Sequence, residues 1–173
     1  MYLAEGNLVI RNATADDARL LCEWWNDGRV MAHAGYPRGL HTTVQRVKAE
    51  LATEADEDHR RLMLEIDSVP IGEMSYRRKD DAAEIGIKIC DFGFQDKGHG
   101  TLALKLLIEC LFHKMGYARI VLDTNENNAR SRHVYEGLGF RQVGVRRRPA
   151  VEGTSEPRIY IDYELARKDF AGK

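Results

Sequence analysis

The sequence predicts a layered α+β fold. Residues 61–66 and 71–76 are two β-type runs separated by an Asp67-Ser68-Val69-Pro70 turn, which is typical of a hairpin. Residues 84–89 alternate between polar and apolar positions, with isoleucines on one face. An apolar stripe at helical spacing follows over residues 104–115. Strands and long helices mixed along one chain indicate helices packed on a sheet.

The remaining elements are short. Residues 8–11 form a strand, and Thr14 is a candidate N-cap for a helix that ends near Asn26. Residues 28–41, which hold glycines, a proline and histidines, are expected to form a loop, and Thr43 can cap a second helix. The later elements are a strand at 120–122, a helix capped by Asn128 or Asn127, and two last strands near 140–147 and 158–165.

Composition excludes several classes of protein. The chain has 173 residues, 43% of them hydrophobic and 31% charged, which suits a single domain over residues 1–173. A net charge of −1 disfavours a nucleic-acid partner. No apolar run is long enough to span a membrane, and no secretory signal is expected. The three cysteines, Cys22, Cys90 and Cys110, are odd in number and widely spaced, so neither disulfides nor a metal site is expected. A cytoplasmic location fits best.

The segment from Gln95 to Thr101 is a candidate anion site. It joins a strand end to a long helix through a loop with glycines at 98 and 100. Unpaired amides at a helix N-terminus, together with the helix dipole, suit a pyrophosphate. His99-Gly100 stands where a P-loop needs Lys-Ser/Thr, which disfavours ATP or GTP, and the dinucleotide fingerprint is absent.

Gln95-x-x-Gly98-x-Gly100 also resembles the pyrophosphate loop of the GNAT N-acetyltransferases. Residues 128–140, NARSRHVYEGLGF, are similar to a second conserved run of that family. The N-terminal strand and helix and the Val69–Glu73 hairpin extend the resemblance over nearly the whole chain. The branch that acetylates ribosomal-protein N-termini, spermidine and some aminoglycosides looks most similar.

The resemblance implies a mixed, mostly antiparallel sheet of about 6–7 strands, splayed at the cofactor site and flanked by about 4 helices. Acetyl-CoA would lie in the splay, with the pantetheine arm paired to a strand edge and the pyrophosphate held by loop amides. Residues 90–94 lack the proline that is frequent in this branch and are one residue longer. It is therefore open whether Ile89 or Cys90 faces the pantetheine. The implied cofactor-binding residues are Ile89, Cys90, Gln95, Asp96, Lys97, Gly98, His99, Gly100, Thr101, Asn128 and Ser131.

Tyr135 and Glu84 are the candidate catalytic residues. A tyrosine, with a pKa of about 10, can protonate a departing thiolate at neutral pH. The alternative for Tyr135 is a core aromatic whose hydroxyl is satisfied by a backbone group. A glutamate matching Glu84 serves as base in some relatives, and the alternative is an exposed carboxylate opposite Lys or Arg. For Asn128 the alternative to cofactor contact is a simple N-cap, and both can hold together.

The resemblance also places the acceptor pocket around the first helix and the loop that follows it. Trp25 lies on an apolar stripe and is expected in the core, whereas Trp24 is offset from it. Glu73, in the hairpin, could meet a cationic acceptor. The candidate substrate-binding residues are Trp24, Asp27, His33, Tyr36 and Glu73.

Two functions from different classes follow. The first is direct acetyl transfer from acetyl-CoA to a primary amine of a small molecule or peptide N-terminus, with no metal. The second is a non-catalytic acyl-CoA-binding module that regulates a partner. A nucleotide hydrolase is opposed by the missing P-loop lysine. The resemblance also implies that a homodimer is common among relatives.

Overall fold

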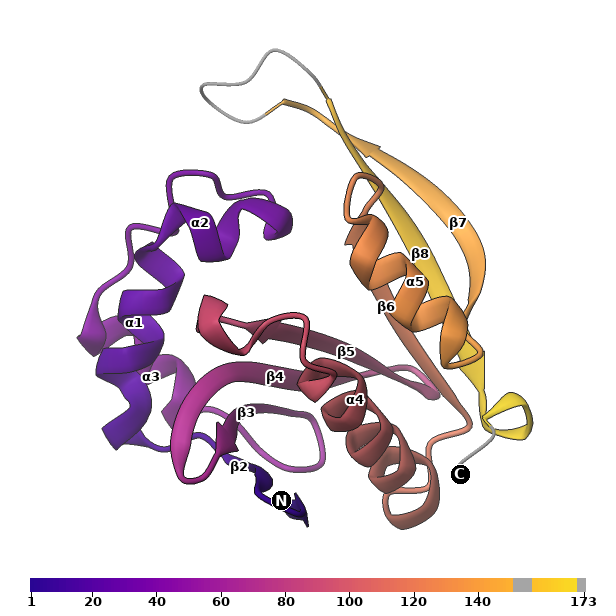
Figure 1. Ribbon diagram of the computed structural model, residues 1–173, viewed down its shortest axis with the longest axis horizontal. Helices are drawn as coiled ribbons and strands as arrows, with labels where there is room; N and C mark the ends of the chain where they lie inside the picture. Colours follow the sequence, from indigo (N-terminus) through magenta and orange to yellow (C-terminus); the bar gives the residue numbers. More distant parts are fainter. Residues whose placement is uncertain (151–156, 171–173) are drawn as a thin grey trace.

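A computed structural model describes residues 1–150 and 157–170. In these residues one sheet of eight strands runs in the order β1-β2-β3-β4-β5-β6-β8-β7 (Figure 1). The only parallel neighbours among them are β5 and β6, so the predicted mixed, mostly antiparallel sheet is confirmed. The strands are β1 (Tyr2–Glu5), β2 (Leu8–Asn12), β3 (His59–Ile66), β4 (Val69–Lys79), β5 (Ala82–Ile89), β6 (Arg119–Asn125), β7 (Arg141–Arg148) and β8 (Arg158–Ala166).

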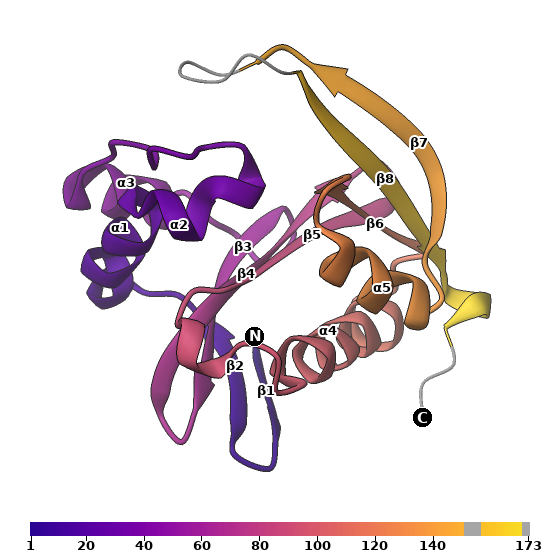
Figure 2. The same cartoon turned by 45° about the horizontal axis from the view of Figure 1, so that its top comes forward.

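Two helical layers cover the sheet (Figure 2). On β3 the side chains alternate, so Met63 packs against the helices of the N-terminal half while Leu62 and Leu64 face the C-terminal helices. The first layer contains α1 (Ala18–Asn26), α2 (Gly28–Met31) and α3 (Val44–Ala52), and the second contains α4 (His99–Glu109) and α5 (Ala129–Gly137). The longest helix continues as a π-turn over Cys110–Lys114.

The predicted element counts were too low. The strand β1 was missed because four residues are too few to show a period, and it forms by pairing with β2 across a turn at Gly6. The short helix α2 lies in the expected loop, and Asp27 starts it by accepting a hydrogen bond from the Arg29 amide at 2.8 Å. The predicted cap residues Thr43 and Asn128 do cap their helices.

The sheet opens between β5 and β6. These strands pair only from Ala82 to Glu84, opposite residues 119–121. Beyond Glu84, β5 continues along β4 to Ile89, whereas β6 continues along β8 to Asn125, so the two strands diverge (Figures 1 and 2). The candidate functional site lies in this opening.

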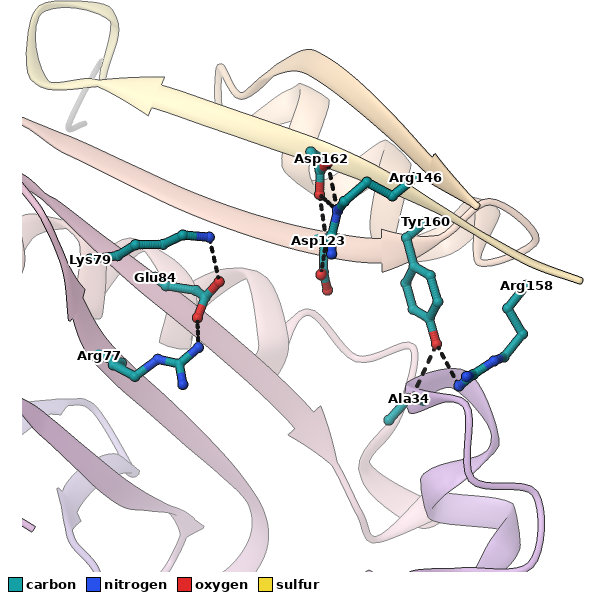
Figure 3. A network of polar contacts seen from close by, with 9 residues as sticks. All are labelled: Ala34, Arg77, Lys79, Glu84, Asp123, Arg146, Arg158, Tyr160 and Asp162. Carbon is teal, nitrogen blue, oxygen red and sulfur yellow. Dashed lines mark hydrogen bonds and ion pairs between the residues drawn. The ribbon is translucent and has the colours of Figure 1, made fainter. Parts of the chain in front are cut away.

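The β7–β8 ribbon reaches back across the opening to the first helical layer. The Tyr160 hydroxyl donates to the Ala34 carbonyl oxygen at 3.3 Å, and Arg158 Nη1 donates to the Gly35 carbonyl oxygen at 3.2 Å. Both contacts join the ribbon to the turn after α2, and Figure 3 shows the one between Tyr160 and Ala34.

Candidate active site

A cleft of about 760 Å³ fills the opening between β5 and β6. Its walls come from the α2 region, β5, the 95–101 loop, α4, β6, α5 and β8. This volume lies in the range of small-molecule and cofactor sites. The predicted residues that line it are His33, Ile89, Gln95, Asp96, Gly98, His99, Gly100, Thr101, Asn128, Ser131 and Tyr135.

The edge of β5 along the cleft presents Ile89 and not Cys90. The Cys90 amide donates to the Ile71 carbonyl oxygen on β4 at 2.9 Å. Backbone groups alternate along a strand, so the groups of Ile85, Ile87 and Ile89 point away from β4, toward the cleft. The Gln95 side chain confirms this direction, because its Nε2 donates to the Ile89 carbonyl oxygen at 2.9 Å.

The extra residue after β5 is absorbed in a local irregularity. The amides of Cys90 and Asp91 both donate to the Ile71 carbonyl oxygen, at 2.9 and 3.0 Å, so the ladder ends with two residues opposite one. Cys90 is buried, and burial raises the pKa of its thiol far above the ordinary value. The thiol is therefore protonated at neutral pH and unsuited to nucleophilic attack.

The loop before α4 forms a cradle of backbone amides. Asp96 and Gly98 have positive φ angles of 59° and 82°, which turn the chain into the helix. The amides from His99 to Thr101 have no acceptor within the helix, and no side chain in the described residues caps them. A Cβ added at Gly100 would lie 3.8 Å from the Ile89 side chain, so packing within the protein does not itself require glycine there.

Of the two cations near this loop, Arg130 lies at the cradle and Lys97 does not. Arg130, at the start of α5, donates from Nη1 to Asp96 Oδ1 at 2.9 Å and to Gln95 Oε1 at 3.3 Å. It thus adds a cation to the cradle that the sequence analysis missed. Lys97 points elsewhere, over the Phe94 ring, and is not part of the cleft lining.

Tyr135 lies inside the cleft on α5. Its ring packs against Phe140 and Tyr163, each with a centroid distance of 5.9 Å. Burial raises the pKa of Tyr135 to about 12, the charge of Asp123 adds to this effect, and a hydrogen bond with Ser131 opposes it. The phenol is therefore protonated at neutral pH, as a proton donor must be.

Glu84 lies outside this cleft. Its carboxylate pairs with Arg77 and, at 3.2 Å, with Lys79 (Figure 3). Burial alone would raise the pKa of Glu84, but these two cations outweigh it and lower the pKa. Glu84 faces a second groove of about 350 Å³, so the structure favours the ion-paired carboxylate that was its alternative interpretation.

Glu73 does not meet the cleft either. It is buried, and its carboxylate accepts from Trp25 Nε1 at 2.9 Å, Lys88 Nζ at 3.0 Å and Arg61 Nη1 at 3.0 Å. Burial opposes ionisation, but Arg61 and Lys88 outweigh it and lower the pKa of Glu73. The prediction that Glu73 contacts an acceptor is therefore corrected: its oxygens are already occupied, and of these four residues only Lys88 lines the cleft.

Three of the other acceptor candidates also lie off the cleft. Asp27 caps α2 and pairs with Arg29, and Tyr36 is exposed. Trp24 packs beside the cluster of the first helical layer, of which Trp25 is a buried member as predicted. Only His33 of the five candidates lines the cleft. Which side chains of this helix and the loop after it reach the cleft depends on tertiary contacts that periodicity does not report.

The family model described as an acetyltransferase (GNAT) domain matches residues 7–141. The chain belongs to the GNAT acetyltransferase family. The resemblance of the two sequence motifs to this family is thereby confirmed.

Solved GNAT structures share the fold. Spermidine N-acetyltransferase from Vibrio cholerae, in complex with CoA and spermine, has a TM-score of 0.83 at 18% identity, over 95% of this chain and 98% of that chain. Ribosomal-protein alanine acetyltransferase from Vibrio fischeri has a TM-score of 0.81 at 18% identity, over 98% of each chain. A ribosomal-protein α-N-acetyltransferase in complex with coenzyme A has a TM-score of 0.83 at 15% identity, over 100% of each chain. At these identities the matches show the GNAT fold.

Proposed function

We propose that this GNAT chain transfers the acetyl group of acetyl-CoA to a primary amine, by direct attack in a ternary complex. The observation that carries the proposal is the convergence of three features in one cleft. They are the uncapped amides at the start of α4, the edge of β5 beyond Glu84 that β6 leaves, and the protonated phenol of Tyr135.

The described residues fit the proposed cosubstrate. The amides from His99 to Thr101, with Arg130 beside them, suit the two negative charges of a pyrophosphate. The cleft-facing groups of Ile87 and Ile89 suit an extended amide chain such as pantetheine, which would take the place that β6 leaves. Acetyl-CoA, when bound, supplies an activated thioester, and the chain positions it for attack.

Tyr135 would act on the leaving sulfur. A thiol has a pKa of about 8.5, which lies below the value of about 12 for Tyr135. Transfer of the phenol proton to the thiolate is therefore unfavourable unless Tyr135 receives another proton in the same step. The attacking nitrogen must lose protons as the amide forms, so it can supply the proton that Tyr135 receives. We accordingly assign Tyr135 a relay role between the nitrogen and the sulfur.

The acceptor is proposed only as a class. The side of the cleft that His33 lines is left for it once the cosubstrate occupies β5 and the loop. Among the described residues no helix is long and apolar enough to cross a membrane. Function as a single domain in the cytoplasm is part of the proposal, and the three free, buried cysteines agree with a reducing compartment.

Thiol release from acetyl-CoA tests the proposal. The assay uses a panel of peptide, polyamine and aminoglycoside amines, with coenzyme A affinity measured by calorimetry. We expect turnover on at least one class, and Tyr135→Phe should lower kcat by about 10²-fold with unchanged coenzyme affinity. The matched control is Tyr117→Phe, because the Tyr117 hydroxyl is buried outside the cleft without a partner in the described residues. Tight coenzyme A binding with no turnover on any amine would instead favour the binding module.

A further inference from the structure

One wall of the cleft carries basic side chains and, among the residues that the structure describes, no acidic one. It consists of Arg29, Val30, His33 and Ala34 from the α2 region together with Lys88 on β5, and we call it the α2 wall. Its titratable members are an arginine, a histidine and a lysine. A substrate that lies against this wall therefore meets positive charge.

The acidic residues that line the cleft lie on other elements. In the described chain they are Asp96, in the loop before α4, and Asp123, across the opening on β6. Asp96 pairs with Arg130 at 2.9 Å, and Asp123 pairs with Arg146 (Figure 3). Neither carboxylate belongs to the α2 wall, so this wall offers no counter-ion to a second ammonium group of an acceptor.

The side chain of Lys88, and not its backbone, is available to a ligand. Its carbonyl oxygen points toward β4, where a Cβ added at Gly72 would lie 2.2 Å from it. Its Nζ donates to Glu73 Oε1 at 3.0 Å, the oxygen that also accepts from Trp25 on α1, so the side chain lies on the face of β5 toward the first helical layer. The side chain is 28% exposed. An ammonium has three donors, and Glu73 takes one of them.

The positive charge at Lys88 is only partly cancelled. Glu73 is a single carboxylate with two cationic partners, Arg61 at 3.0 Å on one oxygen and Lys88 at 3.0 Å on the other. With Glu73 ionised, the three groups carry a net charge of +1, and Lys88 is the one that lines the cleft. Arg29 differs, because Asp27 pairs with its guanidinium at 2.7 Å and balances its charge. Lys88 is therefore the cation of the α2 wall that is best placed to bind an anion.

We propose that the acceptor carries a carboxylate beside its amine and that Lys88 binds this carboxylate. The inference rests on the proposed acetyl transfer. The amine must reach the thioester near Tyr135 on α5, across the opening, so the rest of the acceptor lies against the α2 wall. A carboxylate there accepts a charge-assisted hydrogen bond from Lys88 Nζ. The further ammonium groups of a polyamine or an aminoglycoside would instead meet like charge.

Matched acceptors test this preference on the unaltered protein. One pair is an amino acid and its carboxamide, and the other is a peptide with glutamate at its second position and the same peptide with glutamine there. In thiol release, kcat/KM should be about 10- to 100-fold higher for the carboxylate member of at least one pair, as expected for a hydrogen bond to a charged group. The pair that shows the preference identifies the source as a free amino acid or a peptide. Spermidine and an aminoglycoside should be poorer acceptors than that carboxylate member.

Lys88→Gln tests the residue itself, with Lys88→Arg as the variant that keeps the charge. Lys79→Gln is the matched control, because Lys79 also pairs with a strand carboxylate, Glu84, at 3.2 Å but does not line the cleft. We expect Lys88→Gln to raise KM for the carboxylate member by about 10-fold or more, with little change for the uncharged member and unchanged coenzyme A affinity. Lys88→Arg and Lys79→Gln should both keep the preference.

The outcomes separate the two proposals. If the unaltered protein acetylates both members of each pair equally, or prefers spermidine or the aminoglycoside, the acceptor class is overturned and acetyl transfer stands; this comparison needs no variant to fold. If Lys88→Gln lowers activity equally on both members of a pair, the effect is structural and the role of Lys88 is overturned. If the unaltered protein binds coenzyme A but acetylates no amine, the proposed function fails and the inference fails with it.

Discussion

The buried carboxylate of Glu73 should be among the most sensitive positions for stability. It is 1% exposed and accepts hydrogen bonds from Trp25, Arg61 and Lys88, which come from α1, β3 and β5. The guanidinium of Arg61 also stacks over the Trp25 ring at 4.8 Å. Glu73 on β4 thus ties the first helical layer to three adjacent strands.

Glu73→Gln removes the charge but not the volume. Arg61 and Lys88 then face each other across a buried site without their counter-ion. Removing one partner of a buried ion pair costs about 3–5 kcal/mol. A domain of this size loses about 2–4 °C of melting temperature per kcal/mol, so the expected loss is roughly 6–20 °C. Urea unfolding monitored by circular dichroism gives the free energy directly, and Asp81→Asn, an exposed pair, should leave it unchanged within error.

The pH dependence gives an independent check. The pKa of Glu73 is lowered in the folded state from an ordinary value of 4.5, so the unfolded chain binds the proton first as pH falls. The contribution of Glu73 is therefore fully present at neutral pH and is lost in acid, as pH falls below 4.5. The stability gap between the unaltered protein and Glu73→Gln should narrow over that range. An unchanged midpoint at neutral pH, or a gap that stays constant into acid, would refute this account.

Three further substitutions act on the cleft. Gly35→Ala should melt at a lower temperature than the unaltered protein, because φ is +92° there and the added Cβ would lie 2.1 Å from Arg158 Nη1 and 2.5 Å from the Tyr160 hydroxyl. A melting temperature equal to that of the unaltered protein would contradict the contact between the β7–β8 ribbon and residue 35. Gly98→Ala should cost about 1 kcal/mol and weaken coenzyme A binding in calorimetry, because φ is +82° although no atom lies within 4 Å. Arg130→Gln should weaken coenzyme A binding several-fold at low salt and less at high salt; a salt-independent loss would indicate a structural effect instead.

Local signals in the sequence account for the predictions that the structure confirmed. Thr43 and Asn128 cap helices because a short polar side chain can reach an amide two or three residues ahead. The alternation from Glu84 to Ile89 predicts β5 because side chains on a strand alternate faces. The cradle at Gly98 follows from a glycine that precedes a long apolar stripe. Each of these signals lies within a few residues of the feature that it predicts.

Assignment of the charged residues required the tertiary structure. Glu84 and Glu73 are both strand carboxylates near the predicted site, and nothing local distinguishes them from Asp123. Their surroundings depend on distant partners: Glu73 bonds with Trp25, 48 residues away, and Asp123 with Arg146, 23 residues away. Pairing over such separations reflects register and strand order, which periodicity does not encode.

The Gln95–Gly100 segment by itself predicted an anion site, and with the run over residues 128–140 it indicated the family that the family model shows. Those are properties of short runs of backbone. Only the folded sheet decided that Ile89 faces the cleft, because the Cys90 amide is taken by Ile71 on the neighbouring strand. Only the divergence of β5 from β6 decided which carboxylate enters the cleft, because a side chain's surroundings depend on which strands are paired at its position.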